Sequence, residues 1–495
     1  MTIILLLAPI GLPMAAALVY AAAGWRPYTT AWVGVVTTAL LAADALSLAA
    51  TATRHGPVHT AGGVIRADAL SAWMLLGVAA VALLACWASP AYLTAGHTSA
   101  PRARWYGFLL HLFIAAMATA VLAGNLGILW VAVEATTIVT AFLVGHHRSR
   151  TALEAAWKYV VICSAAIAIA FLGLVLLYYA AKHAGLSGED ALDWATLTGH
   201  AHQLDPAVTR IAIGLAVIGF GAKAGLVPLH AWLPDAHSQA PAPISALMSG
   251  VLLPVAFYAV LRVKAIADPA LGAGYLRTLL LILALATLAL AAVLLIGQRD
   301  YKRMLAYSSM EHMGLIALAA AIGTRLAIAA LLLHMAGHGL AKTVAFLSSG
   351  HILHRHNSSQ ITDVRALATR MPLLAGLFGL AIVALLGFPP GALFASELGI
   401  ARAGATAGLS WATAAAFALV GAAFAAIGAH TGRMLLSPQP VTATVAAEAS
   451  DPPAALTPAA ATPLIAGLLG VAALGITLGP AAGLLHAAAN IVGAP

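Results

Sequence analysis

Ionisable side chains lie inside some of the most apolar stretches of this sequence. Glu134 is near the middle of the run GNLGILWVAVEATTIVTAFLVG, and Lys223 follows a long uncharged stretch that ends in GFGAKAGLVP. A charge at the centre of a lipid bilayer costs several kcal/mol, so such residues usually pair with one another or mark an ion pathway. We therefore interpret Glu134 and Lys223 as a pair that exchanges protons. The alternatives are a structural hydrogen bond to a neighbouring helix for Glu134 and a side chain that reaches the membrane surface for Lys223.

A second group repeats at the spacing of a helical turn. His334, His338 and Lys342 are four residues apart, so they share one helix face and follow each other at about 6 Å along its axis. Histidine titrates near neutral pH and burial lowers the pKa of a lysine, so this row suits a proton relay. The HxxxH spacing also occurs in zinc sites. No carboxylate follows at helical spacing to supply a third ligand, so we predict no metal site.

Further titratable residues lie close to predicted loops or helix ends. Glu397, in GFPPGALFASELGI, is interpreted as the terminal group of the relay, although a carboxylate that faces solvent also fits. Among the weaker candidates, Lys158 fits equally well as an anchor at the membrane surface. These weaker pathway candidates are Lys158, His230, Asp235, His237, Glu311 and His312.

Prolines interrupt two apolar stretches beside these charges. Pro228 follows Lys223, and Pro389 with Pro390 precedes Glu397. Proline removes a backbone donor and clashes with the preceding turn, so a helix ends or kinks there. Inside a membrane such a break is tolerated only where it is buried in protein or lines a water-filled cavity, and transporters place ion sites at such breaks. We therefore predict two broken helices.

The composition defines the protein class. Of the 495 residues, 62% are apolar and 8% are charged, whereas soluble domains have about 25% charged residues. Soluble globular folds are excluded, and the predicted class is an all-α polytopic membrane protein. The net charge of +8 comes from basic residues scattered singly in loops, which is typical of a topology signal and not of nucleic-acid binding. Cys86 and Cys163 are isolated in apolar segments, so we predict no iron–sulfur site in this chain.

About fourteen apolar runs are long enough to cross roughly 30 Å of hydrocarbon. The first run lacks a preceding basic region, so we interpret it as a span and not as a cleaved signal. Asp68 is predicted to cap the helix that follows it. The runs are 2–23, 29–52, 67–88, 107–123, 125–146, 155–181, 208–228, 242–264, 273–297, 304–322, 326–352, 371–388 with 391–404, 408–436 and 460–490.

The ionisable residues follow a similar order in two parts of the chain. Glu134, Lys158 and Lys223 in the first part are matched in order by ionisable residues of the second. Five spans per part is an odd number, so the second part is inverted in the membrane, as in many transporters. We predict two inverted five-helix repeats. The predicted divisions are helices 1–3 at 1–105, the first repeat at 106–264, the second repeat at 273–436, a flexible loop at 437–458 and helix 14 at 459–495.

Basic residues favour one orientation of these spans. With both termini outside, thirteen Lys and Arg residues fall on the cytoplasmic side and nine on the other, which agrees with the positive-inside rule. The polar segment 182–207 is interpreted as a solvated loop. The thirteen are Arg26, Arg102, Arg104, Arg148, Arg150, Lys158, Arg299, Lys302, Arg303, Arg355, Arg365, Arg370 and Arg433.

Several motifs carry a resemblance to a known family. The stretch GAKAGLVPLHAWLPDAHSQAPAPISALMSG, the glutamate of LWVAVEATT and the run HMAGHGLAKTVAFLSSG resemble the antiporter-like subunits shared by respiratory complex I, membrane-bound hydrogenases and multi-subunit Na⁺/H⁺ antiporters. The resemblance covers most of residues 60–435, and DYKRMLAYSSMEHMG with the fourteen-span length is most similar to the F-type member of the hydrogenase-4 branch. It implies one half-channel per repeat, joined by a central polar axis. The residues it implies for this pathway are Glu134, Lys223, His334, His338, Lys342 and Glu397.

One position departs from the family pattern. Quinone-reductase members have a lysine in the motif SGxLLK, whereas this chain has SGVLLP with Pro254. The lysine that would bridge Lys223 and the central relay is missing, so water or the histidines have to replace it. The chain also ends at its fourteenth predicted span, without the long lateral helix of the largest family members.

The expected function is that of a proton-translocating subunit in a redox-driven complex, of the group-4 [NiFe] hydrogenase or formate hydrogenlyase type. This chain is expected to bind no cofactor, and nickel–iron and iron–sulfur centres are expected in partner subunits. Expected partners are antiporter-like and quinone-site-like membrane subunits and soluble oxidoreductase subunits. The alternatives are a complex I-type quinone reductase, a multi-subunit Na⁺/H⁺ antiporter and a membrane scaffold for a soluble enzyme. The expected location is the bacterial inner membrane, with both termini periplasmic.

Overall fold

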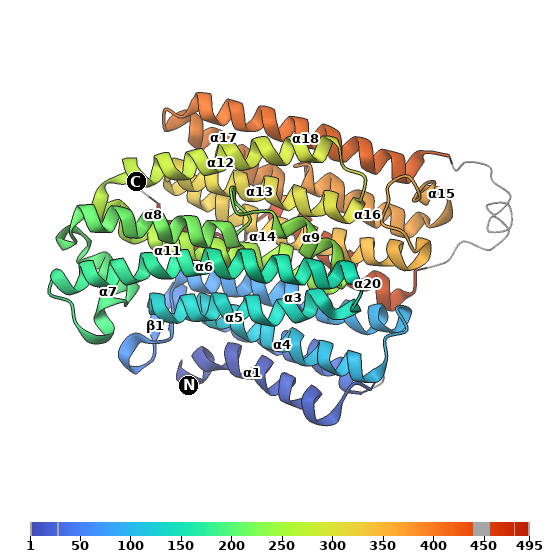
Figure 1. The fold of residues 1–495 in the computed structure, drawn as a ribbon, viewed down its shortest axis with the longest axis horizontal. Helices are drawn as coiled ribbons and strands as arrows, with labels where there is room; N and C mark the ends of the chain where they lie inside the picture. The colour runs from blue at the N-terminus through green and yellow to red at the C-terminus, as the bar shows by residue number, and fades with distance from the viewer. Residues whose placement is uncertain (1, 27–28, 439–455, 480, 494–495) are drawn as a thin grey trace.

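The computed structural model describes residues 2–26, 29–438, 456–479 and 481–493, and every structural statement below concerns these residues. Long helices lie side by side and form one elongated bundle (Figure 1). Thirteen of the described helices are long and apolar enough to cross a membrane. The predicted all-α polytopic fold is therefore confirmed.

The N-terminal part consists of long helices joined by short connections. β1 (Val58–His59) and β2 (Arg66–Ala67) form a small antiparallel pair between the second and third helices. The helices are α1 (Thr2–Ala23), α2 (Val33–His55), α3 (Ala69–Ala95), α4 (Ala100–Leu122), α5 (Leu126–Val144), α6 (Arg150–His183) and the short α7 (Trp194–Gly199). Short 3₁₀ turns are η1 (Thr30–Trp32), η2 (Ala61–Gly63), η3 (Gly145–His147), η4 (Gly188–Ala191) and η5 (Ala201–Gln203).

The remainder of the bundle contains several helices in two pieces. Its first members are α8 (Pro206–Lys223), α9 (Trp232–Gln239), α10 (Ala242–Leu247), the π-helical turn η6 (Met248–Leu252), α11 (Leu253–Leu271), α12 (Ala273–Ile296) and α13 (Tyr301–Ile322). The later members are α14 (Arg325–His356), α15 (Leu367–Arg370), α16 (Pro372–Leu385), α17 (Ala392–Thr406), α18 (Ser410–Leu436), α20 (Pro458–Ile476) and α21 (Ala481–Val492).

Fourteen crossings result when each interrupted helix is counted once. The pairs α8 with α9, α16 with α17, and α20 with α21 each make one crossing. α1 begins and α21 ends at the same end of the bundle, the left-hand end in Figure 1, as expected for an even number of crossings. Helices five crossings apart run in opposite directions, as two inverted five-helix repeats require.

The centre of the bundle is formed by α11, α13 and α14, which are buried nearly throughout. Small residues allow these helices to approach closely, as at other membrane helix interfaces. A Cβ atom on Gly339 of α14 would lie only 2.7 Å from the carbonyl oxygen of Gly250 in η6. Larger residues at either position would separate the backbones, so this pair sets the distance between the two halves.

Both predicted breaks are present, although the first begins earlier than expected. The run 208–228 was predicted to be helical, but α8 ends at Lys223 and α9 starts only at Trp232. Gly225 has a φ of +86°, a left-handed conformation that glycine adopts without steric cost. The second break separates α16 from α17 and contains the predicted Pro389–Pro390 pair.

The predicted solvated loop 182–207 is wrong in part. It contains α7, whose Trp194 is buried. The guanidinium carbon of Arg262 lies 3.9 Å from the centroid of the Trp194 ring. Arg262 also donates two hydrogen bonds of 2.7 Å to the carboxylate of Asp68. Asp68 accepts from the backbone N–H of Ser71 at 2.8 Å, which confirms the predicted helix cap. Asp68 therefore caps α3 and also forms a buried ion pair with Arg262.

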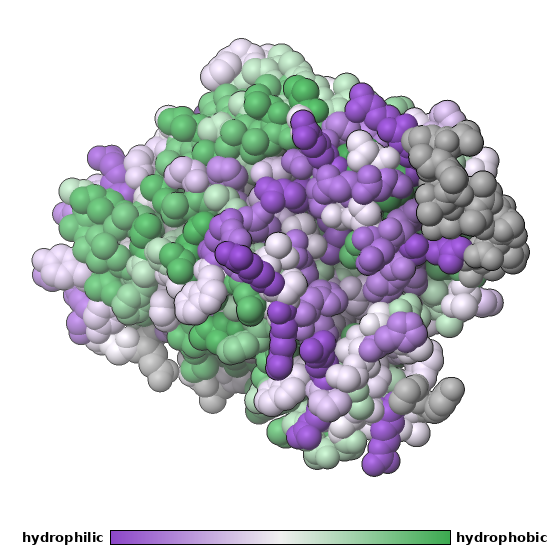
Figure 2. All heavy atoms as spheres, turned by 45° about the vertical axis from the view of Figure 1, so that its right-hand side comes forward, coloured by the Kyte–Doolittle hydropathy of each residue, from purple (hydrophilic) through white to green (hydrophobic). Residues whose placement is uncertain are grey.

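The C-terminal expectations need one correction. The predicted single span 460–490 is divided, because α20 ends at Ile476 and α21 begins at Ala481. Most of the predicted flexible loop 437–458 lies outside the described residues. Hydrophilic side chains gather on the end of the bundle where α4, α6 and α13 begin, and hydrophobic ones cover the adjacent side (Figure 2). This end carries the basic residues that were predicted to be cytoplasmic.

Candidate functional site

Glu134 and Lys223 are connected through a threonine. Lys223 Nζ donates hydrogen bonds to Thr137 Oγ1 at 2.8 Å and to Tyr159 OH at 2.6 Å. Thr137 donates in turn to Glu134 Oε2 at 3.2 Å, and Glu134 Oε1 accepts from Ser164 Oγ at 2.8 Å. The structure therefore brings the predicted pair together, with one hydroxyl group between the amine and the carboxylate.

Lys223 is fully buried in the last turn of α8. A cation at the C-terminal end of a helix interacts favourably with the helix dipole. Its Nζ also lies 4.6 Å from the ring centroid of Tyr159 and 5.9 Å from that of Trp232, within the range of cation–π attraction. Hydroxyl groups, a helix end and two aromatic faces thus stabilise the charged amine.

Glu134 lies on the outer side of α5 and is only partly buried. Val131 and Ile138, one turn before and after it, are 58% and 56% exposed. An apolar exposed face on a membrane helix contacts either lipid or another subunit. Glu134 therefore joins the inside of the chain, through Thr137, to a surface that lies within the membrane.

Lys158 and Asp235 belong to a surface ion-pair cluster and not to the buried row. Lys158 Nζ is 2.7 Å from Glu154 and 3.2 Å from Asp235, and Arg303 Nη1 is 2.6 Å from the other oxygen of Asp235. The Lys158 side chain is 47% exposed, in keeping with the alternative that it is an anchor. His230 is only partly buried, in the break after α8. These contacts tie α9 to α6 and α13.

Lys342 is fully buried near the middle of α14. Its Nζ donates to the carbonyl oxygen of Leu305 at 2.8 Å and to the hydroxyl of Ser308. The next residue, Ser309, forms a hydrogen bond of 2.7 Å with Ser249 of η6. Lys342 therefore has one hydroxyl and one carbonyl partner, and no ionised partner is in direct contact among the described residues.

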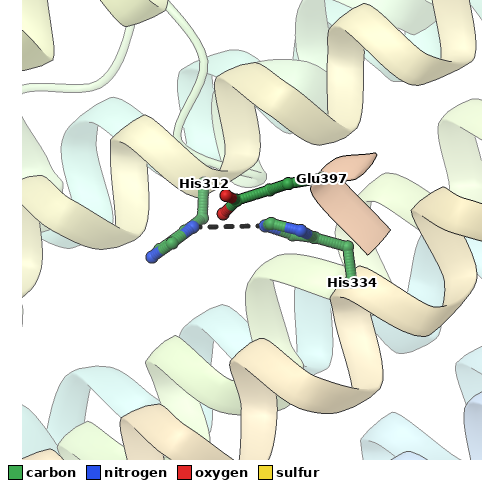
Figure 3. A group of neighbouring side chains, drawn as sticks. All are labelled: His312, His334 and Glu397. Atoms are coloured by element: carbon green, nitrogen blue, oxygen red, sulfur yellow. Dashed lines mark hydrogen bonds between the residues drawn. The ribbon is translucent and has the colours of Figure 1, made fainter. Parts of the chain in front are cut away.

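His312 of α13 and His334 of α14 face each other (Figure 3), with His312 Nδ1 and His334 Nε2 3.2 Å apart. His334 Nδ1 is 2.9 Å from Ser396 Oγ, and Ser396 donates its hydroxyl proton to Leu393 O at 2.8 Å. The Ser396 oxygen can therefore only accept from His334 Nδ1. This fixes the neutral tautomer of His334 and leaves a lone pair on Nε2, directed at His312.

The expectation that Glu311 and His312 lie near a loop is wrong. Asp300 accepts from the backbone N–H of Arg303 at 2.9 Å and caps α13 there, so both residues are in the middle of a helix and fully buried. The ring centroids of His312 and His338 are 5.0 Å apart. Glu311 Oε2 lies 3.5 Å from His312 Nδ1. The polar side-chain atoms of Glu311 and His338 have no hydrogen-bond partner among the described residues, and buried groups of this kind are normally satisfied by water.

Glu397 brings a carboxylate to the same cluster from α17. It is only 8% exposed, so it does not face solvent. Its carboxylate packs against Gly387 in the second break, where φ is +64° and a Cβ atom would collide with it. One donor atom each of His312, His334 and Glu397 lie within 4.8 Å of one another. The predicted terminal group thus lies beside the central histidines.

His237 lies between the two lysine sites. It is fully buried in α9, with its ring centroid 6.1 Å from that of Trp232 and 5.7 Å from that of Phe346. Trp232 covers Lys223 on one side, and Phe346 follows Lys342 by one helical turn. An imidazole therefore occupies the region between the two amines.

Sequence reasoning missed the hydroxyl groups that connect these charges. Serine, threonine and tyrosine are common in membrane helices, so their types carry no signal unless a charged neighbour is known. The connecting hydroxyl groups belong to Thr137, Tyr159, Ser164, Ser249, Ser308, Ser309 and Ser396.

The two cysteines, Cys86 and Cys163, are buried and form no disulfide, and they lie in the apolar core.

Known families and relatives share sequence with this chain. Residues 123–424 match the family described as "NADH:quinone oxidoreductase/Mrp antiporter, TM". The chain is 41% identical over 305 residues to a hydrogenase-4 component F homolog of Methylacidiphilum infernorum, covering 61% of this chain and 63% of that relative. It is 32% identical over 395 residues to NADH-quinone oxidoreductase subunit N of Desulforudis audaxviator, covering 77% and 76%.

The fold is shared with solved membrane complexes. A chain in the structure of the Mrp complex from Dietzia sp. superposes with a TM-score of 0.86 at 23% identity, covering 99% of this chain and 98% of that one. This likeness concerns the fold, whereas the sequence matches above concern the family. The chain belongs to the NADH:quinone oxidoreductase/Mrp antiporter family of antiporter-like membrane subunits.

Proposed function

We propose that this chain carries protons across the membrane for a redox-driven complex of the hydrogenase type. One observation carries the proposal. Hydrogen bonds link the partly exposed Glu134 through Thr137 to the buried Lys223, and further buried ionisable groups, Lys342 and the histidine cluster, lie in the same bundle. Buried ionisable groups without a structural ion-pair partner are costly in a membrane protein, and their usual role is ion transfer.

The attraction between Glu134 and Lys223 is comparable to the energy needed to move a proton against a membrane potential. Moving one proton against 100 mV costs about 2.3 kcal/mol. Two unit charges about 5 Å apart, with one hydroxyl between them, attract by about 3 kcal/mol at an effective dielectric constant of 20. A movement that separates Glu134 from Lys223 weakens this attraction and changes the energy of a proton shared by the pair. A partner that shifts the outer face of α5 would thereby push a proton toward Lys342.

His237 replaces the lysine that is missing at Pro254 in this proposal. Pro254 is buried in the first turn of α11, directly after the π-helical turn. His237 stands between the surroundings of Lys223 and Lys342, and imidazole both accepts and donates a proton near neutral pH. The Ser249–Ser309 hydrogen bond crosses the same boundary between the repeats at 106–264 and 273–436.

The identity of the complex rests on the relatives. The hydrogenase-4 component F homolog matches at the highest identity of the relatives compared above, which favours a hydrogenase over the quinone reductase alternative. Nickel–iron and iron–sulfur centres would then be held by partner subunits. The site residues of this chain would move protons in the bacterial inner membrane, beside other antiporter-like subunits.

Proton transfer and partner identity are tested on the purified complex. Mild-detergent purification followed by mass spectrometry is expected to recover subunits that bind nickel–iron and iron–sulfur centres. In reconstituted vesicles, acidification per redox turnover is measured with a pH-sensitive dye. Lys342→Ala is expected to lower this ratio by about 100-fold, the usual contribution of a positioned proton donor, while redox activity with an artificial acceptor is retained.

Lys264→Ala is the matched control. Lys264 is also buried and paired with Asp268 near the far end of α11, outside the proposed row, so vesicles with this variant should acidify normally. Normal pumping by Lys342→Ala would refute the pathway. Recovery of a complex without any redox subunit would refute the hydrogenase assignment and favour an antiporter.

A further inference from the structure

The histidine cluster has the donor set of a metal site. One nitrogen each of His312 and His334 and one carboxylate oxygen of Glu397 lie within 4.8 Å of one another, on three different helices. Figure 3 shows the carboxylate of Glu397 pointing toward the two rings. We propose that these three residues bind a divalent transition-metal ion such as Zn²⁺, and that the ion blocks the pathway when it is bound.

The spacing of the two nitrogens fits zinc. Two ligands at about 2.0–2.1 Å from a tetrahedral Zn²⁺ lie about 3.3 Å apart, and His312 Nδ1 and His334 Nε2 are 3.2 Å apart. In the metal-free state one proton lies between these nitrogens. When the metal takes its place, this proton moves to His312 Nε2, which has no hydrogen-bond partner among the described residues. The ring therefore stays neutral.

The surroundings hold the ligands in the required state. Ser396 accepts from His334 Nδ1 and keeps the lone pair on Nε2 pointed into the cluster, as the outer partners of metal-binding histidines do. Glu397 Oε1 has no hydrogen-bond partner among the described residues, and its carboxylate is held against Gly387. Two imidazoles and one carboxylate form the ligand set that zinc uses when it keeps a fourth position open for water.

The chemistry of the ligands selects the metal. Imidazole nitrogen suits zinc, copper, cobalt and nickel, whereas Na⁺, Mg²⁺ and Ca²⁺ prefer oxygen ligands. The site would therefore not compete with transport of an alkali cation. A bound metal occupies the lone pairs with which His312 and His334 exchange a proton, so the inhibition rests on the proposed proton transfer, while the binding itself does not.

Metal binding is tested on the full-length chain in its detergent-purified complex, with a tag that contains no histidine. The protein is treated with a chelator, incubated with Zn²⁺, desalted and analysed for zinc by mass spectrometry. The unchanged protein is expected to retain one more zinc ion per chain than His334→Gln, His312→Gln or Glu397→Gln. Co²⁺ in place of Zn²⁺ should give the visible absorption of a tetrahedral ion in the unchanged protein and not in these three variants.

His338→Gln is the matched control, because it removes a buried histidine one turn further along α14 that is not in the donor set. It should retain the zinc ion. Ser396→Ala is expected to weaken binding by about tenfold, as for other outer partners of zinc ligands. Equal zinc retention in all variants, or loss with His338→Gln, would overturn the assignment.

Proton-transport assays distinguish a failure of the metal site from a failure of the proposed function. Vesicles are assayed with and without Zn²⁺. Proton transfer that is normal without Zn²⁺ and unaffected by it would refute the inhibitory site alone. Binding of one zinc ion by a chain that carries no protons would refute the proposed function and leave the metal site standing.

Discussion

Glu134 and Lys223 share one hydroxyl group. Thr137 accepts a hydrogen bond from Lys223 at 2.8 Å and donates one to Glu134 at 3.2 Å. A hydroxyl in this position can pass a proton from the amine to the carboxylate by giving up its own proton to one side and taking one from the other. The threonine therefore connects the outer face of α5 with the interior of the chain.

Thr137→Val removes this hydroxyl and keeps the shape of the side chain. We expect proton transfer in vesicles to slow by about tenfold, which corresponds to about 1.4 kcal/mol, while the complex assembles normally. Thr137→Ser should restore most of the rate. Thr136→Val is the control, because the Thr136 hydroxyl donates to Val133 O in its own helix. A Thr137→Val rate equal to that of the control would show that the hydroxyl is not used.

The sequence alone predicted the groups that have a local signature. Lys223 stands beside a proline break, and the central histidines repeat at helical spacing, so both could be recognised without a structure. Glu311 and His312 were expected near a loop, because the polar residues before them resemble one, although Asp300 starts the helix well before them. The contact of Glu397 with the histidines depends on how α17 packs against α13 and α14, and no local pattern encodes that.

For the fold, the sequence alone predicted the membrane crossings but not the contacts between distant parts of the chain. Hydropathy gives the crossings because each must present apolar residues to the membrane. It does not give pairings across long stretches of chain, such as Asp68 with Arg262, which are 194 residues apart. It also failed for α7, because a short helix that covers a buried arginine has the polar composition of a loop.

The Asp68–Arg262 pair is expected to hold α3 to α11. Arg262→Met leaves the buried carboxylate without its partner, which costs about 3–5 kcal/mol in other buried pairs. We expect a clear fall in the thermal unfolding temperature of the detergent-solubilised chain. Arg277→Met, at an exposed position of α12, should unfold like the unchanged protein. Equal unfolding temperatures of the two variants would contradict this role.

The Asp68–Arg262 pair should also make the thermal stability of the chain depend on pH. Burial acts to raise the pKa of Asp68, but the charge and hydrogen bonds of Arg262 outweigh it and hold the pKa below its usual value. The stabilisation is therefore fully present above the unfolded-state pKa of about 4 and is lost as the pH falls through the lower folded-state value. Unfolding temperatures measured from pH 7 to pH 3 should fall more steeply for the unchanged protein than for Arg262→Met.

The orientation in the membrane is predicted from the basic residues. The end of the bundle where α4, α6 and α13 begin is hydrophilic (Figure 2) and carries the thirteen basic residues assigned to the cytoplasm. A reporter that is active only in the periplasm, fused after the last residue, should be active. A cytoplasmic reporter at the same position should be inactive. The reverse result would exchange the two sides of the proposed pathway.

The last prediction concerns His237, because the two lysine sites need a link where Pro254 replaces the family lysine. His237→Phe keeps an aromatic ring against Trp232 and Phe346 and removes only the exchangeable proton. We expect acidification per turnover to fall by about tenfold or more, without a change in unfolding temperature.

The control for His237→Phe is His111→Phe, which changes a buried histidine of α4 whose Nδ1 contacts Gly107 O, away from the row. Both variants lose one buried imidazole, so only a direct role in proton transfer separates them. If His237→Phe pumps as well as His111→Phe, protons cross between Lys223 and Lys342 by another route. The Ser249–Ser309 hydrogen bond would then be the next link to break, since it joins the two halves beside Ser308, which accepts from Lys342.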